Sequence, residues 1–127
     1  MAATKVTRVL IVEDDDLVRQ YTQTLVLSFG HELVAAVACP QDALGILSQD
    51  RAIDLLITDL LLPGDLDGFA LAKRARQDHP DLAVLLVSGQ GATELQAGDP
   101  REGRLSYLRK PFRKKQLAES IATLLDA

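Results

Sequence analysis

The sequence predicts a doubly wound α/β fold, with a five-stranded parallel sheet and helices on both of its faces. The first observation is that short apolar runs alternate with amphipathic stretches along the chain. Strands that alternate with helices pair in parallel, and the helices then cover both faces of the sheet. The second observation is the length of 127 residues, which suits one domain and leaves no room for two. Together they predict a flavodoxin-like domain over residues 1–127.

The strands are expected at the five apolar runs, 9–12, 32–37, 55–58, 82–87 and 106–108. The first run is Val-Leu-Ile-Val, which is typical of a strand that the sheet buries on both faces. The third run ends in Asp59, the fourth ends in Ser88, and the fifth is the shortest.

The amphipathic stretches predict helices at 15–29, 41–49, 69–77 and 113–125. Apolar residues recur near helical spacing in the first of these, at Leu17, Val18, Tyr21, Leu25 and Leu27. Gly30 is expected to end that helix, and Pro40 is expected to open the second, which Gly45 weakens. The last helix carries apolar residues on one face, namely Leu117, Ile121, Leu124 and Leu125.

A further helix, the fourth in chain order, is expected only in weak form between the fourth and fifth strands. The segment Gly89–Gly103 holds four glycines and Pro100, and only Ala92–Ala97 is free of interruption. The sequence therefore predicts a short or mobile fourth helix there.

Composition and charge exclude several classes of protein. Apolar residues make up 47% of the chain, which is too many for a disordered segment, and the net charge of -4 argues against a general nucleic-acid binder. Met1–Arg8 lacks the apolar core of a signal peptide, and the longest apolar run, Leu82–Val87, is too short to span a membrane. The single cysteine, Cys39, excludes an internal disulfide and is expected to be buried or half-buried. We expect a cytoplasmic protein.

Polar residues suited to phosphate chemistry follow four of the five predicted strands. The acidic run Glu13–Asp16 follows the first strand, Asp59 ends the third, Ser88 ends the fourth, and Lys110 follows the fifth. In doubly wound sheets the ligand site lies at the carboxyl ends of the strands. We therefore expect these side chains to share one site.

The chemistry of this residue set favours magnesium and phosphoryl transfer. Clustered carboxylates repel one another unless a cation neutralises them, and oxygen ligands without His or Cys favour a hard cation such as Mg²⁺. An aspartate beside such a metal can attack a phosphorus atom while metal and ammonium neutralise the charge on the equatorial oxygens. A Lys supplies the ammonium and a Ser hydroxyl a hydrogen bond.

The response-regulator receiver family of two-component signalling has four motifs that the chain resembles. Its first strand and acidic pair resemble VLIVEDDDLVR at 9–19, and its phospho-acceptor segment resembles LLITDLLLPGDLDG at 55–68. Its last two motifs match LLVSG at 85–89 and YLRKPF at 107–112. Any one of these is a weak signal, but the four occur in the right order over essentially the whole chain.

The resemblance implies a signalling domain that catalyses only its own phosphorylation and dephosphorylation. Asp59 would be the phospho-acceptor, and a sensor histidine kinase or a histidine phosphotransfer protein would supply the phosphoryl group. Lys110 would pair with that phosphoryl group. Glu13, Asp14, Asp59 and the backbone carbonyl of Leu61 would bind Mg²⁺. Beside this resemblance, the net charge of -4 and the short apolar runs predict no direct contact with nucleic acid and no membrane insertion.

The resemblance also implies a switch and two positions that tune the phosphoryl lifetime. Ser88 would bond the phosphoryl group and shift on activation, and the ring of Tyr107 would then turn inward. Leu61 and Gln90 would lie beside the path of the attacking water. The Lys110-Pro111 bond is often cis in the family.

Two departures from the family pattern concern the site. The first acid is Glu13 where the family more often has Asp, and the longer side chain is expected to shift the metal slightly. The loop Pro63–Gly68 is one residue longer than the common form. The glycines of segment 89–103 also argue against a rigid output surface there.

Other polar residues near the site have structural interpretations. Asp15 is expected to cap the first helix, with Asp16 in its first turn, and Asp67 is expected to cap the third helix. Asp65 is expected to be exposed. The histidines, His31 and His79, are expected on the surface at element boundaries.

Three other functions compete with the receiver. A haloacid dehalogenase-like phosphatase would use Asp14 as nucleophile and Asp16 as acid, but Val18 stands where that class has Thr, and no cap segment is visible. A flavin mononucleotide binder needs a Ser/Thr/Gly-rich loop where this chain has four acids. A pseudo-receiver would bind proteins without being phosphorylated. With no output domain after the last helix, a stand-alone regulator or a receiver from a hybrid kinase is expected.

Overall fold

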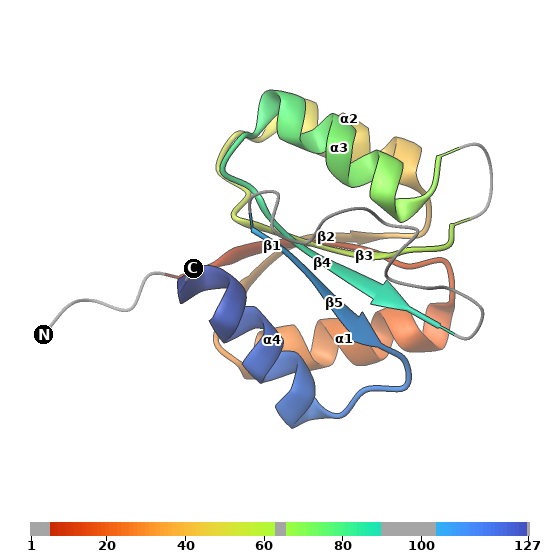
Figure 1. The fold of residues 1–127 in the computed structure, drawn as a ribbon, viewed down its shortest axis with the longest axis vertical. Coiled ribbons are helices and arrows are strands. Elements are labelled where there is room, and N and C mark those ends of the chain that lie inside the picture. Colours follow the sequence, from red (N-terminus) through yellow and green to blue (C-terminus); the bar gives the residue numbers. More distant parts are fainter. Residues whose placement is uncertain (1–5, 63–65, 90–103, 127) are drawn as a thin grey trace, which may run out of the picture.

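The computed structural model describes residues 6–62, 66–89 and 104–126, and it contains a five-stranded parallel sheet in the order β2-β1-β3-β4-β5 (Figure 1). The strands are β1 (Arg8–Val12), β2 (Glu32–Val37), β3 (Leu55–Asp59), β4 (Ala83–Ser88) and β5 (Leu105–Arg109). The helices are α1 (Asp16–Ser28), α2 (Pro40–Gln49), α3 (Gly68–Asp78) and α4 (Lys114–Asp126). All nine elements agree with the prediction to within one residue at either end.

The helices form one layer on each face of the sheet. Figure 1 shows α2 and α3 together on one face and α1 and α4 on the other. Successive residues of β1 point into opposite layers: Leu10 and Val12 pack beneath α2 and α3, whereas Val9 and Ile11 pack beneath α1 and α4. This alternation produces two apolar cores, one on either side of a sheet whose central strands are buried.

Capping residues begin and end the helices as predicted. Asp15 accepts two backbone amides at the start of α1, and Asp67 Oδ1 accepts one at the start of α3 at 2.8 Å. Gly30 follows α1 with φ of +86°, a conformation that favours glycine. Pro40 is the first residue of α2. Local sequence signals therefore set these boundaries.

The predicted apolar face of the first helix is only partly right. Leu25 is buried as expected, but Leu17 is 78% exposed, Leu27 54% and Tyr21 44%. The buried residues of α1 are Thr22, Leu25 and Val26. Thr22 tolerates burial because its hydroxyl donates to the Val18 carbonyl at 2.8 Å, so no polar group is left without a partner. The apolar residues of the sequence alone therefore place the inward face only in part.

The surface prediction for His79 is also wrong, although the residue does end α3. His79 is 6% exposed, and its Nε2 lies 2.7 Å from the Leu47 carbonyl at the C-terminal turn of α2. The ring is buried because α2 and α3 pack side by side. His31 is half-buried rather than exposed, and this burial lowers its pKa. Cys39 is half-buried, as predicted.

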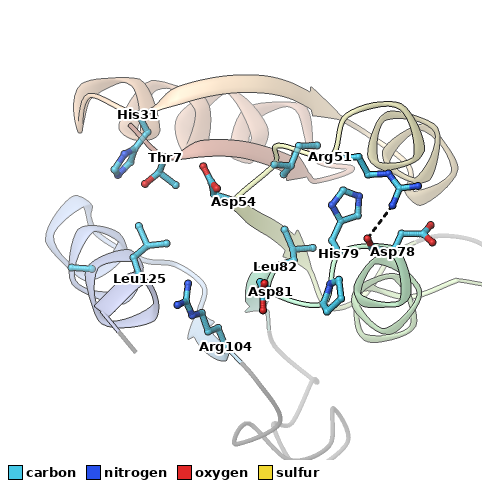
Figure 2. Close-up of a pocket in the computed structure, with 13 residues that line it drawn as sticks. Thr7, His31, Arg51, Asp54, Asp78, His79, Asp81, Leu82, Arg104 and Leu125 are labelled. Carbon is cyan, nitrogen blue, oxygen red and sulfur yellow. Dashed lines mark hydrogen bonds between the residues drawn. The ribbon is translucent and has the colours of Figure 1, made fainter. Parts of the chain in front are cut away.

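A cavity lies at the amino ends of the strands. It has a volume of about 660 Å³ and is lined by residues that precede β1, β3, β4 and β5, namely Thr7, Asp54, Leu82 and Arg104 (Figure 2). His79 also lines it. The carboxyl ends of the strands, where the ligand site was predicted, lie at the opposite edge of the sheet.

Some predictions fall outside the described residues. The expected helix within 89–103 lies there apart from Gly89, as do Gln90 and the exposed Asp65. Within the described ranges, no helix is both long and apolar enough to cross a membrane.

Candidate functional site

The carboxyl ends of four strands bring the predicted site residues together. β3 pairs in parallel with β1 and β4, and β4 pairs with β5, so all four strands end at the same edge of the sheet. Glu13 directly follows β1, Asp59 ends β3, Ser88 ends β4, and Lys110 directly follows β5. The parallel topology alone thus places residues almost 100 positions apart in one site.

Lys110 lies between two buried carboxylates. Its Nζ is 2.7 Å from Glu13 Oε1 and 2.9 Å from Asp59 Oδ2, and the two acids are only 4% and 7% exposed. Burial raises the pKa of Glu13, although the hydrogen bond from Lys110 opposes the change. Burial acts to lower the pKa of Lys110, but its hydrogen bonds to Glu13 and Asp59 together raise it. Lys110 is therefore held in its charged form.

The acidic residues of the site fit a hard divalent cation. Glu13, Asp14 and Asp59 each offer one carboxylate oxygen, and the three oxygens lie within 4.8 Å of one another. Lys110 supplies one positive charge against the three carboxylates, which leaves net negative charge for a cation to neutralise. Asp14 is exposed, so the site is open to solvent. An all-oxygen set of this kind suits Mg²⁺.

Backbone contacts fix the position of Glu13. Its amide donates to the Val37 carbonyl on β2 at 2.9 Å, and its own carbonyl accepts from Arg19 Nη1 at 2.9 Å. Its Oε2 accepts from the Asp15 amide at 3.1 Å. Arg19 also pairs with Asp16, so α1 is tied to the acidic run by this guanidinium.

The backbone around Asp59 is equally constrained. Its carbonyl accepts from the Thr58 hydroxyl at 3.0 Å, and the next amide, of Leu60, donates to the Val87 carbonyl at 2.8 Å. The first residue of α3, Gly68, is packed against the same carbonyl so closely that an added Cβ would lie 2.0 Å from its oxygen. Asp59 thus sits at the contact between β3 and α3.

Ser88 and Tyr107 occupy neighbouring strands behind the site. Ser88 is 3% exposed, and its carbonyl accepts from the Lys110 amide at 2.7 Å. Tyr107 is half-buried on β5 and packs against the core beneath α2 and α3. Both therefore lie on strands next to the site, although no described contact joins either side chain to Asp59. The Lys110-Pro111 bond is cis, as expected.

Leu61 lies at the rim of the site. Its amide donates to Asp59 Oδ1 at 3.3 Å, and its side chain is 54% exposed.

The sequence did not predict a role near the site for three residues, namely Arg19, Tyr21 and Gly68. Arg19 lies one helical turn after the acidic run, which is a signal that a search for partners of that run would have found. Gly68 is the first residue of α3, where glycine costs less than in a helix interior, so no sequence pattern reveals its close approach to Asp59. Tyr21 contacts Phe112 from 91 residues away, and no local pattern reveals such a pair.

The comparisons with known proteins give one consistent family. The model of the response regulator receiver domain matches residues 9–122. Response regulator protein FleR of Pseudomonas aeruginosa is 37% identical over 91% of this chain. Response regulator receiver protein CpdR of Brucella abortus is 30% identical over 94% of this chain. The chain spans 24% of FleR but 98% of CpdR.

A solved structure agrees with the same assignment. The crystal structure of a response regulator receiver protein from Sinorhizobium medicae WSM419 superposes with a TM-score of 0.85 at 27% identity. The match covers 97% of either chain. The sheet order, the site at its carboxyl edge and the match over most of the sequence lead to one conclusion: this chain belongs to the response regulator receiver domain family of two-component signalling.

Proposed function

We propose that Asp59 accepts a phosphoryl group from the phosphohistidine of a sensor histidine kinase or a histidine phosphotransfer protein. The observation that carries this proposal is the buried carboxylate of Asp59, held by Lys110 at 2.9 Å beside the acidic residues Glu13 and Asp14. Of the three acids, Asp59 is the one at the centre of the sheet edge, on the strand between β1 and β4.

The transfer needs no net proton movement at Asp59. A carboxylate oxygen forms a bond to phosphorus while the bond from phosphorus to the donor nitrogen breaks. The electron pair stays on that nitrogen, and because the other ring nitrogen of the phosphohistidine carries a proton, neutral imidazole leaves. Negative charge develops on the phosphoryl oxygens, and the Lys110 ammonium lies where it neutralises that charge. The Ser88 hydroxyl supplies a hydrogen bond to another phosphoryl oxygen.

Mg²⁺ would be held by the carboxylates of Glu13, Asp14 and Asp59 and by the backbone carbonyl of Leu61. Bound there, the ion supplies positive charge that offsets the repulsion between the acids and the incoming phosphoryl group. Glu13 is also bound to Lys110, so this side chain links the metal-binding acids to the ammonium. Glu13 would bind the ion while it keeps its contact with Lys110.

The domain also catalyses its own dephosphorylation. Water attacks phosphorus, loses a proton to solvent, and releases inorganic phosphate while the Asp59 carboxylate is restored. Leu61 and Gln90 tune this step. We expect that changing either residue alters the phosphoryl lifetime without abolishing phosphorylation, because each follows a site residue by two positions. Decay of the phosphorylated mass over time would measure it, and unchanged lifetimes in both variants would contradict the assignment.

The output is a conformational switch from Ser88 to Tyr107 that alters the surface presented to a target protein in the cytoplasm. Tyr107 is half-buried and packs against the core beneath α2 and α3, so a turn of its ring would change both core and surface contacts. We expect its rotamer to differ between the unphosphorylated and phosphorylated states. NMR of a ring-labelled tyrosine in the two states would test this, and one rotamer in both would exclude the relay.

The proposed function is tested by intact mass after incubation with acetyl phosphate, with and without Mg²⁺. We expect wild type to gain one phosphoryl group that requires Mg²⁺, and Asp59→Asn to gain none. A gain that persists in Asp59→Asn but is lost in Asp14→Asn would instead support the phosphatase-like reading. No gain in wild type, even from a phosphohistidine protein, would favour a pseudo-receiver.

A further inference from the structure

The chain that follows Lys110 is anchored to α1 by Tyr21. The Tyr21 hydroxyl donates to the Phe112 carbonyl at 3.1 Å, and the two rings lie 5.7 Å apart between centroids, tilted by 36°. Phe112 itself is 6% exposed and belongs to the core beneath α1 and α4. The position two residues after Lys110 is therefore held both by the core and by a polar bond from the helix surface.

The other side of Lys110 is anchored to β4. The Lys110 amide donates to the Ser88 carbonyl at 2.7 Å, which continues the pairing of β5 with β4. Lys110 thus stands between two fixed points, one on β4 and one on α1. Its ammonium reaches Glu13 and Asp59 from this short segment, so the direction of the side chain depends on how firmly both points are held.

We propose that Tyr21 is a positioning residue for Lys110, which holds the ammonium where the phosphoryl oxygens must meet it. The inference rests on the proposed function, since it assigns Tyr21 to the reaction at Asp59. Tyr21 is 44% exposed, so its hydroxyl is not required to satisfy a buried group of its own. Its bond goes instead to a carbonyl 91 residues away, in the loop that carries Lys110.

The substitution that isolates this role is Tyr21→Phe, which keeps the ring contact with Phe112 and removes the hydroxyl. Without the bond, the loop after Lys110 gains freedom and the ammonium is less often in the reactive position. We expect the rate of Asp59 phosphorylation by acetyl phosphate at saturating Mg²⁺ to fall about threefold to tenfold. The dissociation constant of Mg²⁺, measured by calorimetry without the donor, is expected to stay unchanged.

A matched control is Thr22→Val on the same helix. Thr22 also makes one hydroxyl bond, to the Val18 carbonyl at 2.8 Å, but that bond stays within α1 and does not touch the loop. We expect Thr22→Val to lose stability without slowing phosphorylation of the folded protein. An equal slowing in both variants, or no slowing in Tyr21→Phe, would show that the Tyr21 hydroxyl is merely structural and would overturn the proposal.

The proposed function and the role of Tyr21 are excluded by different results. If wild type itself gains no phosphoryl group at Asp59, the proposed function fails and the role of Tyr21 fails with it. If wild type is phosphorylated and Tyr21→Phe reacts at the same rate, only the role of Tyr21 is excluded.

Discussion

Replacing Lys110 with alanine is expected to slow phosphorylation of Asp59 by about 100-fold to 1,000-fold, the usual cost of removing one donor that stabilises transition-state charge. The ammonium is the only positive group within hydrogen-bond distance of the Asp59 carboxylate among the described residues. Mg²⁺ would still neutralise part of the charge, so we expect a residual rate rather than none. Time courses of intact mass with acetyl phosphate and saturating Mg²⁺ measure this change.

The same substitution is expected to destabilise the metal-free protein. Lys110 separates Glu13 from Asp59, and without it two buried carboxylates face each other unpaired. Removing one partner from a buried pair costs about 3–5 kcal/mol. Because the Lys110 side chain is 20% exposed and solvent can enter, we expect a loss just below that range, about 2–3 kcal/mol. Urea unfolding without divalent cations measures the difference.

The loss of stability in Lys110→Ala should depend on pH. Burial already raises the pKa of Glu13 above its unfolded value, and removing the ammonium that opposes this shift raises the pKa further. When the pKa of a carboxyl is higher in the folded state than in the unfolded state, the folded state binds more protons at pH values between the two. The fold therefore loses stability as the pH rises from the unfolded pKa through the folded pKa. The difference in the free energy of unfolding between wild type and Lys110→Ala should therefore shrink as the pH falls toward the ordinary pKa range of carboxyl groups.

Two controls separate charge from position. Lys115→Ala removes an exposed lysine whose nearest carboxylate oxygen, on Glu119, is 4.0 Å away, and we expect neither rate nor stability to change measurably. Lys110→Arg keeps the charge but replaces a compact ammonium with a planar guanidinium. We therefore expect it to recover part of the stability that Lys110→Ala loses and to be phosphorylated more slowly than wild type. Equal rates for Lys110→Ala and wild type would contradict the assigned role.

The elements and the four residues of the acidic and basic cluster were predictable because each depends on a local signal. Glu13 and Asp59 each stand at the end of a mainly apolar run that marks a buried strand, and Lys110 follows the shorter fifth strand. Parallel topology then places all three at one edge. No tertiary information beyond strand order is needed for that step. The exact pairing, with Lys110 between two acids, was not predictable from local signals.

The errors have a different physical origin. The inward face of α1 was partly misassigned because burial of Thr22 depends on a hydroxyl bond that leaves no trace in an apolar pattern. His79 was misassigned because its burial follows from the packing of α2 against α3, which depends on both helices at once. Contacts across long sequence separations, such as that of Tyr21 with Phe112, are set by the tertiary arrangement and carry no local pattern.

Replacing Gly68 with alanine is expected to be the most damaging small change near the site. An ideal Cβ at this position would lie 2.0 Å from the Asp59 carbonyl oxygen and 2.9 Å from its carbonyl carbon. Both are backbone atoms of a central strand, so no flexible side chain can move aside. The glycine is required for space rather than for its conformation, because Gly30 is the residue with positive φ among those described.

Either the end of β3 or the start of α3 must move to admit the methyl group. The Gly68 amide donates to the Leu60 carbonyl at 2.9 Å, so movement of α3 would also stretch this bond. We expect Gly68→Ala to lower the free energy of unfolding by about 3 kcal/mol, near the upper end for overpacking. Because Asp59 lies at the contact, the folded fraction should also bind Mg²⁺ more weakly and phosphorylate more slowly.

Gly45→Ala is the matched control for this prediction. Gly45 lies within α2 with nothing within 4 Å of an added Cβ, so alanine there should raise the free energy of unfolding by about 0.5–1 kcal/mol through its higher helix propensity. Urea unfolding of the two variants is therefore expected to give changes in the free energy of unfolding of opposite sign for the same Gly→Ala substitution. If Gly68→Ala were as stable and as reactive as wild type, the close approach of α3 to Asp59 would not constrain the phospho-acceptor.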